Sequence, residues 1–288
     1  MQKVRKAVIP AAGFGTRFLP ETKAIPKEMM PIVDTPALQL VVQEVVDSGI
    51  DNILIITSGR KRSIEDHFDK SAELENLLKK AGKTVELEMC DRIENMANFT
   101  FIRQKEMKGS GQAIQLAREF AAGEPFAVLY GDDLMYSPEK AVTKQLVEAY
   151  EKTGTTILGV QSVDKSEVCK YGVIKPGAIK GRYTEVKGFV EKPPVEEAPS
   201  NLVSMGRYVL TPEVFEQLEQ SEYAPNGELY LTTAIERMIH TSGVYAYEFE
   251  GIRYDTGDKL GYLKAIVEYA LRDEKLQKPF SDYLKTIK

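Results

Sequence analysis

The feature that most constrains the fold of this chain is a succession of short apolar runs, each closed by a turn, with amphipathic stretches between them. The apolar runs span 7–11, 52–57, 99–102 and 126–130. The amphipathic stretches span about 36–48, where Thr35 is the expected N-cap, and 112–121. Strands that alternate with helices predict an α/β fold with a mixed, mostly parallel sheet flanked by helices. Ligands of such sheets bind beyond the carboxyl ends of the strands, so the turns there are the first candidates for a site.

The second half of the chain is less regular. Residues 171–176 and 186–190 predict a hairpin, and strand patterns return at 205–210 and 244–249. Helices are expected at 229–240 and 260–272, and prolines mark an exposed loop over 193–199. No polar linker separates the halves. We therefore expect a single domain over 1–288, made of parts 1–135 and 136–257 and a helical tail, 258–288.

Charge and apolar content exclude several classes of protein. The 38 basic and 43 acidic residues give a net charge of -5, which offers no basic excess for nucleic acid or an anionic membrane. No apolar run approaches the ~20 residues that span a bilayer. Cys90 and Cys169 are two widely separated thiols, which fits a reducing compartment. The expectation is a soluble, cytoplasmic protein.

The turn after the first strand reads Gly13-Phe14-Gly15-Thr16-Arg17. Glycines there free backbone N–H groups and let a phosphate approach closely. It is neither a dinucleotide fingerprint nor a Walker loop, because no third glycine or Gly-Lys-Ser/Thr follows. Arg17, Lys23 and Lys27 crowd this loop. A plain turn with a solvated basic face is the alternative, but the loop geometry favours a polyphosphate site.

Three other turns carry charged side chains that suit substrate or metal binding. Asp132 and Asp133 follow the fourth strand and could hold a divalent cation or simply cap a turn. Successive strand side chains point apart, so only one is expected to ligate. Asp255 is a candidate second carboxylate. Glu191-Lys192 could bind a phosphate and a polyol together, or form a surface ion pair.

Histidine is nearly absent from the chain. His67 and His240 lie in helical patterns away from these motifs. Ser-His-Asp and Cys-His catalysis and a zinc site are therefore not expected.

Taken together, the motifs closely resemble those of the bacterial UTP–glucose-1-phosphate uridylyltransferases (UDP-glucose pyrophosphorylases). The likeness covers nearly the whole chain and rests on these segments: 11–20, 22–29, 31–34, 131–133, 170–173, 190–193, 206–210 and 227–229. The related thymidylyltransferases share the glycine loop but typically lack the Lys-Ala-Ile-Pro-Lys-Glu-Met form of residues 23–29.

The resemblance implies a Rossmann-like nucleotidyltransferase fold, dependence on Mg²⁺ and a homodimer or homotetramer. Residues 1–135 would form the nucleotide-binding half, and 136–257 a β-rich half that binds sugar phosphate. Nucleotide contacts are implied for Ala11, Ala12, Gly13, Gly15, Thr16, Glu28, Gln104 and Gly109. Arg17 and Lys27 would face the triphosphate. Gly172, Glu191 and Lys192 would hold the sugar phosphate, and Asp132 and Asp255 the metal ion.

One segment departs from the family pattern. Where the family usually reads Gly-Leu-Gly-His-Ala, this chain has Gly109-Ser110-Gly111-Gln112-Ala113. The glycines that let backbone approach the base are kept. Any contact of the histidine is lost or altered, with consequences for the base or the metal ion.

The reaction implied by the resemblance is the transfer of a uridylyl group from UTP to glucose 1-phosphate, which yields UDP-glucose and pyrophosphate. A phosphate monoester has its second pKa near ~6, so it is mostly dianionic at neutral pH and needs no general base. Catalysis would then come from positioning and charge stabilisation during Mg²⁺-assisted in-line attack, with Arg17, Lys27, Asp132 and Lys192 as the catalytic residues.

Three alternatives stay open on the sequence. The same chemistry could use dTTP or another sugar phosphate. A glycosyltransferase shares a carboxylate–metal site but has no need of a loop that grips β- and γ-phosphates. A non-catalytic sensor of nucleotide sugars needs no grip on pyrophosphate.

Overall fold

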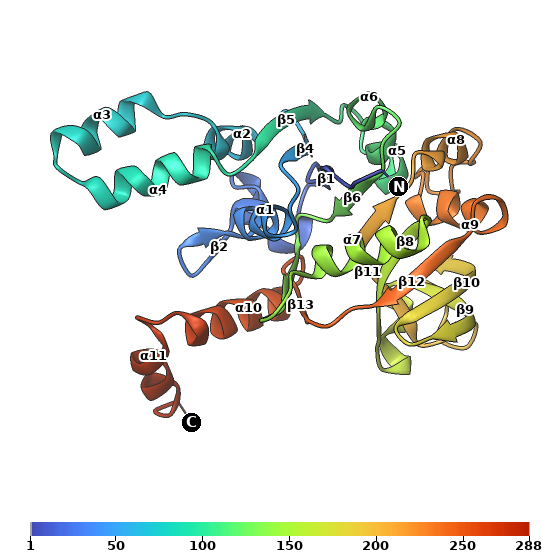
Figure 1. The fold of residues 1–288 in the computed structure, drawn as a ribbon. Helices are drawn as coiled ribbons and strands as arrows, with labels where there is room; N and C mark the ends of the chain where they lie inside the picture. Colours follow the sequence, from blue (N-terminus) through green and yellow to red (C-terminus); the bar gives the residue numbers. More distant parts are fainter. Residues whose placement is uncertain (1, 288) are drawn as a thin grey trace.

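A nine-stranded mixed sheet forms the centre of the computed structural model, which describes residues 2–287 (Figure 1). Its strand order is β5-β4-β1-β6-β11-β8-β12-β10-β9. The strands span β1 Lys6–Pro10, β4 Asn52–Thr57, β5 Asn98–Arg103, β6 Phe126–Leu129, β8 Thr156–Ser162, β9 Gly172–Lys180, β10 Tyr183–Glu191, β11 Leu202–Leu210 and β12 Val244–Glu248.

The first four strands form the parallel part of the sheet. β1 lies between β4 and β6, and β5 adds to the outer edge of β4. All four strands predicted from the apolar runs are confirmed to within a residue at each end. Their central residues, such as Val8, Leu54 and Val128, are fully buried, because helices cover both faces.

Antiparallel pairing governs the second half. β11 runs antiparallel to β6 and to β8, and β9 and β10 form the expected hairpin. β12 is the exception, since it runs parallel to β8. The sheet is therefore mixed, as expected, but it is not mostly parallel, because its second half pairs mainly antiparallel. Three of the parallel pairings lie together among β5, β4, β1 and β6.

A separate two-stranded sheet has direct consequences for the site. β7 (Asp133–Tyr136) pairs antiparallel with β13 (Ile252–Asp255), and Asp133 lies opposite Asp255. This pairing joins the turn after β6 to a segment more than a hundred residues later in the chain. It sets the two Asp-containing turns side by side.

The described residues form eleven α-helices. They span α1 Ala37–Asp47, α2 Arg62–Phe68, α3 Ala72–Lys80, α4 Thr84–Glu94, α5 Gly109–Gln115, α6 Arg118–Ala121, α7 Val142–Thr153, α8 Glu213–Glu219, α9 Leu231–Thr241, α10 Lys259–Arg272 and α11 Gln277–Leu284. None of them has the length and apolar character needed to cross a bilayer. α3 and α4 project from the body as a two-helix arm, and α10 and α11 lead away from it to the C-terminus (Figure 1).

Two local predictions were wrong. Thr35 is not an N-cap, because Thr35–Pro36 forms strand β3, which pairs with β2 (Pro31–Ile32) around a turn in which Val33 has φ 63°. The helix begins one residue later, at Ala37. The single helix expected over 112–121 is two helices, since the chain tightens to i→i+3 bonds at Leu116 and Ala117.

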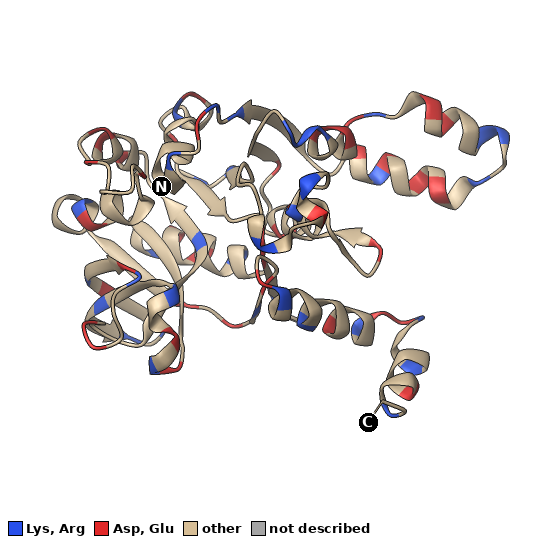
Figure 2. Cartoon of the chain, turned by 180° about the vertical axis from the view of Figure 1, so that it is seen from behind, with Lys and Arg blue, Asp and Glu red and all other residues tan. Residues whose placement is uncertain are grey.

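Basic and acidic residues are interspersed along the ribbon, including the arm of α3 and α4 (Figure 2). No long segment of a single charge sign stands out in this view, which agrees with the near balance of charges in the sequence. Recognition by charge is therefore to be sought in local sites.

Candidate functional site

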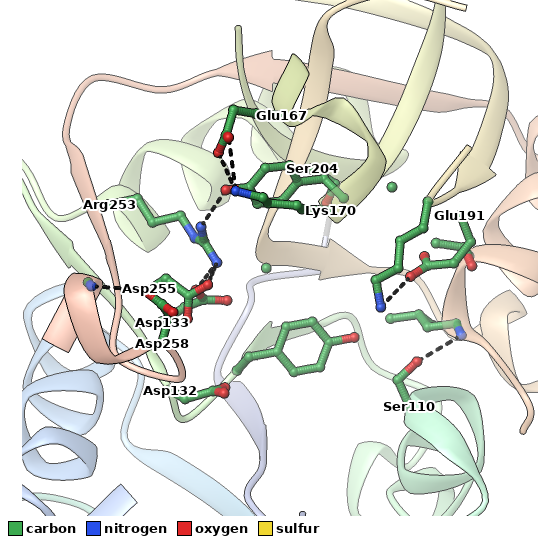
Figure 3. A pocket seen from close by; sticks show the side chains of 18 of the residues that line it. Ser110, Asp132, Asp133, Glu167, Lys170, Glu191, Ser204, Arg253, Asp255 and Asp258 are labelled. Carbon is green, nitrogen blue, oxygen red and sulfur yellow. Dashed lines mark hydrogen bonds and ion pairs between the residues drawn. The ribbon is translucent and has the colours of Figure 1, made fainter. Parts of the chain in front are cut away.

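A cleft of about 890 Å³ opens where the carboxyl ends of the parallel strands meet the β9–β10 hairpin. The sequence-predicted residues that line it are Arg17, Asp132, Gly172, Glu191, Lys192 and Asp255. Figure 3 shows Asp132, Asp133 and Asp255 on one side of the cleft and Glu191 on the opposite side. Elements far apart in the sequence thus bring together the phosphate, metal and sugar candidates.

Asp132 and Asp255 converge on one point beside Gly257. A Cβ placed on Gly257 would lie 2.6 Å from Asp132 Oδ2 and 3.1 Å from Asp255 Oδ1, so glycine leaves room between the two carboxylates. The Thr256 backbone N–H and hydroxyl donate to the carbonyl of Asp132 at 2.9 and 2.8 Å and fix the two turns together. Two converging carboxylates suit a hard divalent cation.

Lys27 forms an ion pair with Asp132 at this point. Desolvation alone would favour the protonated acid, but the positive charge and hydrogen bond of Lys27 hold the pKa of Asp132 below its usual value. Desolvation likewise opposes the charge on Lys27, and Asp132 outweighs it, so the pKa of Lys27 is raised. Both groups are charged at neutral pH.

The glycine loop is held in place by its own turns. Gly15 has φ 67°, and its carbonyl accepts a hydrogen bond of 2.8 Å from the Thr22 hydroxyl. Phe18 is buried and anchors the short 3₁₀ turn Thr16–Phe18, which leaves Gly13 and Arg17 exposed. Arg17 donates to the Gly257 carbonyl at 3.1 Å and thereby bridges the loop to the carboxylate pair.

Beneath the loop lies a buried ion pair that the sequence reading missed. Lys61 Nζ lies 2.7 and 2.8 Å from the two carboxylate oxygens of Glu28 and 2.5 Å from the carbonyl of Ala11. Glu28 is 1% exposed and Lys61 5%. Desolvation raises the pKa of Glu28 and lowers that of Lys61, and their mutual attraction opposes both shifts. Lys61 begins a helix and stood among ordinary surface-type residues, so no local pattern marked it.

Gln104 lies at the far edge of the parallel strands. Its backbone N–H donates to Thr57 O at 2.8 Å, and that of Ala11 donates to Ile56 O at 2.8 Å. The ends of β1 and β5 are thereby held on either side of β4. Gly109, at the start of α5, has φ 91°, and a Cβ there would lie 2.5 Å from the Leu229 carbonyl. Only glycine is tolerated at that close approach.

The sugar-phosphate candidates lie on the hairpin. Gly172 of β9 lies opposite Glu191 of β10, and a Cβ on Gly172 would come within 2.6 Å of the Phe189 ring. Lys192 follows β10 with φ 43°, and its backbone N–H donates to the Tyr171 carbonyl at 3.0 Å. Its side chain lies 3.4 Å from Glu191 and is more than half exposed, so it can turn to a ligand.

Arg253 was not singled out as a site residue, and Asp133 was considered only beside Asp132 as a possible metal ligand. Arg253 forms an ion pair with Asp133, lies 3.5 Å from Asp255 and stacks over the Tyr171 ring. Desolvation raises the pKa of Asp133 to about 6 despite that ion pair. Arg253 holds the carboxylates of β7 and β13 in position. The pairing of β13 with β7 brings these residues together, and no local sequence pattern indicates that pairing.

Comparison with known proteins agrees with this geometry. The family model described as nucleotidyl transferase matches residues 6–272. A UTP–glucose-1-phosphate uridylyltransferase of Staphylococcus saprophyticus is 52% identical over 288 residues, which cover all of this chain and 99% of the relative. One from Staphylococcus epidermidis is 51% identical over 287 residues, with 100% and 99% covered. The chain belongs to this family.

Solved structures support the same assignment. A UDP-glucose pyrophosphorylase complexed with UDP-glucose is 41% identical, with TM-score 0.85 over 94% of this chain and all of that one. A UTP-bound enzyme from Acinetobacter baumannii is 37% identical, with TM-score 0.91 over 99% and 100%. The nucleotidyltransferase fold expected from the motifs is confirmed.

Proposed function

We propose that this uridylyltransferase transfers the uridylyl group of UTP to glucose 1-phosphate, which yields UDP-glucose and pyrophosphate. One observation carries the proposal: a single cleft contains the loop cation Arg17, the Asp132–Asp255 pair and the hairpin residues Gly172 and Lys192. The full-length identity to uridylyltransferases supports it, as do neighbours whose structures hold UDP-glucose and UTP.

The chemistry needs charge control rather than a proton acceptor. A phosphate monoester with a second pKa near ~6 is already mostly dianionic at neutral pH. No histidine lines the cleft within the described residues, which fits an attack that needs no general base. The obstacle is repulsion between a dianion and the triphosphate, and positioned cations reduce it.

Each cation has a distinct place in the proposed mechanism. Arg17, on the exposed loop, would neutralise the triphosphate and the departing pyrophosphate. Lys27, held beside Asp132, would act on the same anion from below the loop. Lys192 reaches from the opposite wall and would orient the attacking phosphate oxygen. The α-phosphorus would be displaced in line, with no covalent enzyme intermediate.

The residues present fit a Mg²⁺ ion. Within residues 2–287, no group of three or more His, Cys, Asp or Glu side chains surrounds a common point. Mg²⁺ commonly takes one or two protein carboxylates and completes its shell with water and substrate phosphates. Asp132 and Asp255 would therefore hold it, and when bound it would neutralise charge on a phosphoryl oxygen.

A homodimer or homotetramer in the cytoplasm remains the family-based expectation.

The deciding experiment is pyrophosphate release with a panel of UTP, dTTP and CTP against glucose 1-phosphate and N-acetylglucosamine 1-phosphate, with and without Mg²⁺. We expect UTP with glucose 1-phosphate to give the highest kcat/KM and EDTA to abolish it. A preference for dTTP or another sugar would reassign the substrate. If the protein binds UDP-glucose but does not exchange labelled pyrophosphate, it is a non-catalytic sensor rather than an enzyme.

A further inference from the structure

Gln112, where the family usually has histidine, contacts the amide of Gln104. Gln104 Nε2 lies 2.5 Å from Gln112 Oε1 and 3.5 Å from the carbonyl of Gly109. A backbone carbonyl only accepts hydrogen bonds, so the long contact with Gly109 identifies the NH₂ group as the end of the Gln104 amide that faces α5, and the shorter contact with Gln112 holds it there. Both neighbours therefore take the NH₂ group, and Gln104 Oε1 is left facing away from them.

The scaffold around this contact is rigid. Gly111 N–H donates to Leu229 O at 2.8 Å, and Leu229 N–H donates to Lys108 O at 2.8 Å. The Ser110 hydroxyl accepts from the Leu231 backbone at 3.1 Å. Gln104 is only 6% exposed. The start of α5 is thus pinned to the segment before α9, and Gln112 meets Gln104 in one arrangement.

We infer that Gln112 is a positioning residue that sets base specificity, by holding Gln104 with its carbonyl oxygen towards the base. This rests on the proposed function. A 2,4-dioxopyrimidine such as uracil offers an N3–H donor to that oxygen. Cytosine in the same pose offers a lone pair at N3, which an acceptor repels. The pair Gln112–Gln104 therefore favours UTP over CTP, although Gln112 itself need not touch the nucleotide.

The inference is tested with side chains of similar size at position 112 that differ in whether they accept a hydrogen bond from Gln104. Gln112→Glu can only accept from Gln104, so it keeps the amide orientation, and we expect the UTP-to-CTP ratio of kcat/KM to be retained. Gln112→Met is of similar length but makes no such bond, and we expect the ratio to fall about tenfold. Gln115→Met, on the same helix and away from this contact, is the matched control and should leave the ratio unchanged.

Gln112→His restores the usual family residue. The pH dependence of its UTP-to-CTP ratio is an effect that a residue with only a packing role would not produce. In Gln112→His, neutral imidazole accepts from Gln104, whereas imidazolium only donates and would turn the amide around. We expect the UTP-to-CTP ratio of this variant to fall as pH drops through the ordinary imidazole pKa of ~6.5, while that of the wild type stays level. Taking the ratio cancels the titration of glucose 1-phosphate, which both nucleotides share.

The outcomes separate this inference from the proposed function. If the wild type releases no pyrophosphate from UTP and glucose 1-phosphate, the proposed function fails. If the wild type is active but folded Gln112→Met keeps its full ratio, Gln112 does not set specificity. The inference is also overturned if Gln112→Glu loses the ratio as Gln112→Met does, with circular dichroism and melting temperature unchanged in both. If Gln112→Met does not fold, the Glu and His variants decide the matter.

Discussion

Two ion pairs near the end of β6 differ in how completely the protein itself satisfies their charges. Arg207 and Glu44 are sealed in the interior, where Arg207 is 0% exposed. Glu44 also accepts bonds from the Thr143 backbone and hydroxyl at 3.0 and 2.6 Å, and Arg207 donates to the Asp133 carbonyl at 2.5 Å. Every strong partner of this pair is supplied by the protein.

The Lys27–Asp132 pair is left incomplete by comparison. Its members keep 18% and 28% of their side-chain surface, and Asp132 faces the space beside Gly257. Such a pair retains bonding capacity for a phosphate and a cation. Unsatisfied bonding capacity, rather than the presence of charge, therefore distinguishes the Lys27–Asp132 pair from the Arg207–Glu44 pair.

Breaking the sealed pair should have the largest effect. Arg207→Met leaves the Glu44 carboxylate buried without its cation, which costs about 3–5 kcal/mol of unfolding free energy. Urea unfolding followed by circular dichroism measures the loss. Arg118→Met, which removes an exposed pair with Glu219, is the control and should cost less than about 1 kcal/mol. Equal losses in the two variants would remove the distinction between sealed and open pairs.

Breaking the open pair should instead affect the reaction. Asp132→Asn is expected to lower kcat about 100–1000-fold, because it removes one of two carboxylates in the cleft, while the melting temperature stays near that of the wild type. Initial rates of pyrophosphate release at saturating substrates measure it. The exposed Asp282→Asn is the control. A near-normal rate would exclude Asp132 as a metal ligand.

Substitution of Lys192 tests whether a cation on the hairpin side of the cleft also acts on a substrate. Lys192→Met should raise the KM for glucose 1-phosphate about tenfold and that for UTP much less, because a single charged contact is lost. Full substrate titrations of both reactants measure the split. Lys187→Met, on β10 just before Lys192 and with an exposed ion pair to Glu185, should change neither. An unchanged dependence on glucose 1-phosphate would refute the placement of Lys192.

The smallest expected effect is that of His67 on the pH dependence of stability. Its ring nitrogen lies 2.9 Å from Gln39 Oε1, and burial lowers its pKa below the ordinary 6.5. The unfolded chain therefore takes up a proton more readily than the folded one, and stability declines as pH falls from about 6.5 towards the lowered pKa. As the pH falls across this range, the urea midpoint should decline less in His67→Gln than in the wild type. The His240→Gln variant is the control and should show the same decline as the wild type. An equal decline in all three would contradict the assignment.

How far the sequence predicts this molecule depends on whether the signal is local. Continuous apolar runs identified the four parallel strands, because such strands are buried on both faces. The arm of α3 and α4 was not predicted, and its helices are largely exposed rather than packed on the core. α7 and β8 were also not predicted, although both are largely buried.

The residues of the candidate site also differ in whether a local sequence pattern indicates them. Glycine and lysine in the loop after β1 were visible as a motif. Lys61, Arg253 and Gln112 owe their places to partners in distant elements: Ala11 and Glu28, the β7–β13 pairing, and the side chain of Gln104. Such contacts depend on tertiary register, which spacing along one chain does not specify.

The short β7–β13 ladder also imposes an order on biosynthesis. Its two strands lie more than a hundred residues apart, so a nascent chain that stops before Asp255 carries one acidic side of the cleft and lacks the other. The two carboxylates therefore come together only after β13 has been synthesised. Proteolytic cleavage just before β13 would leave most of the sheet while removing Asp255 from the cleft.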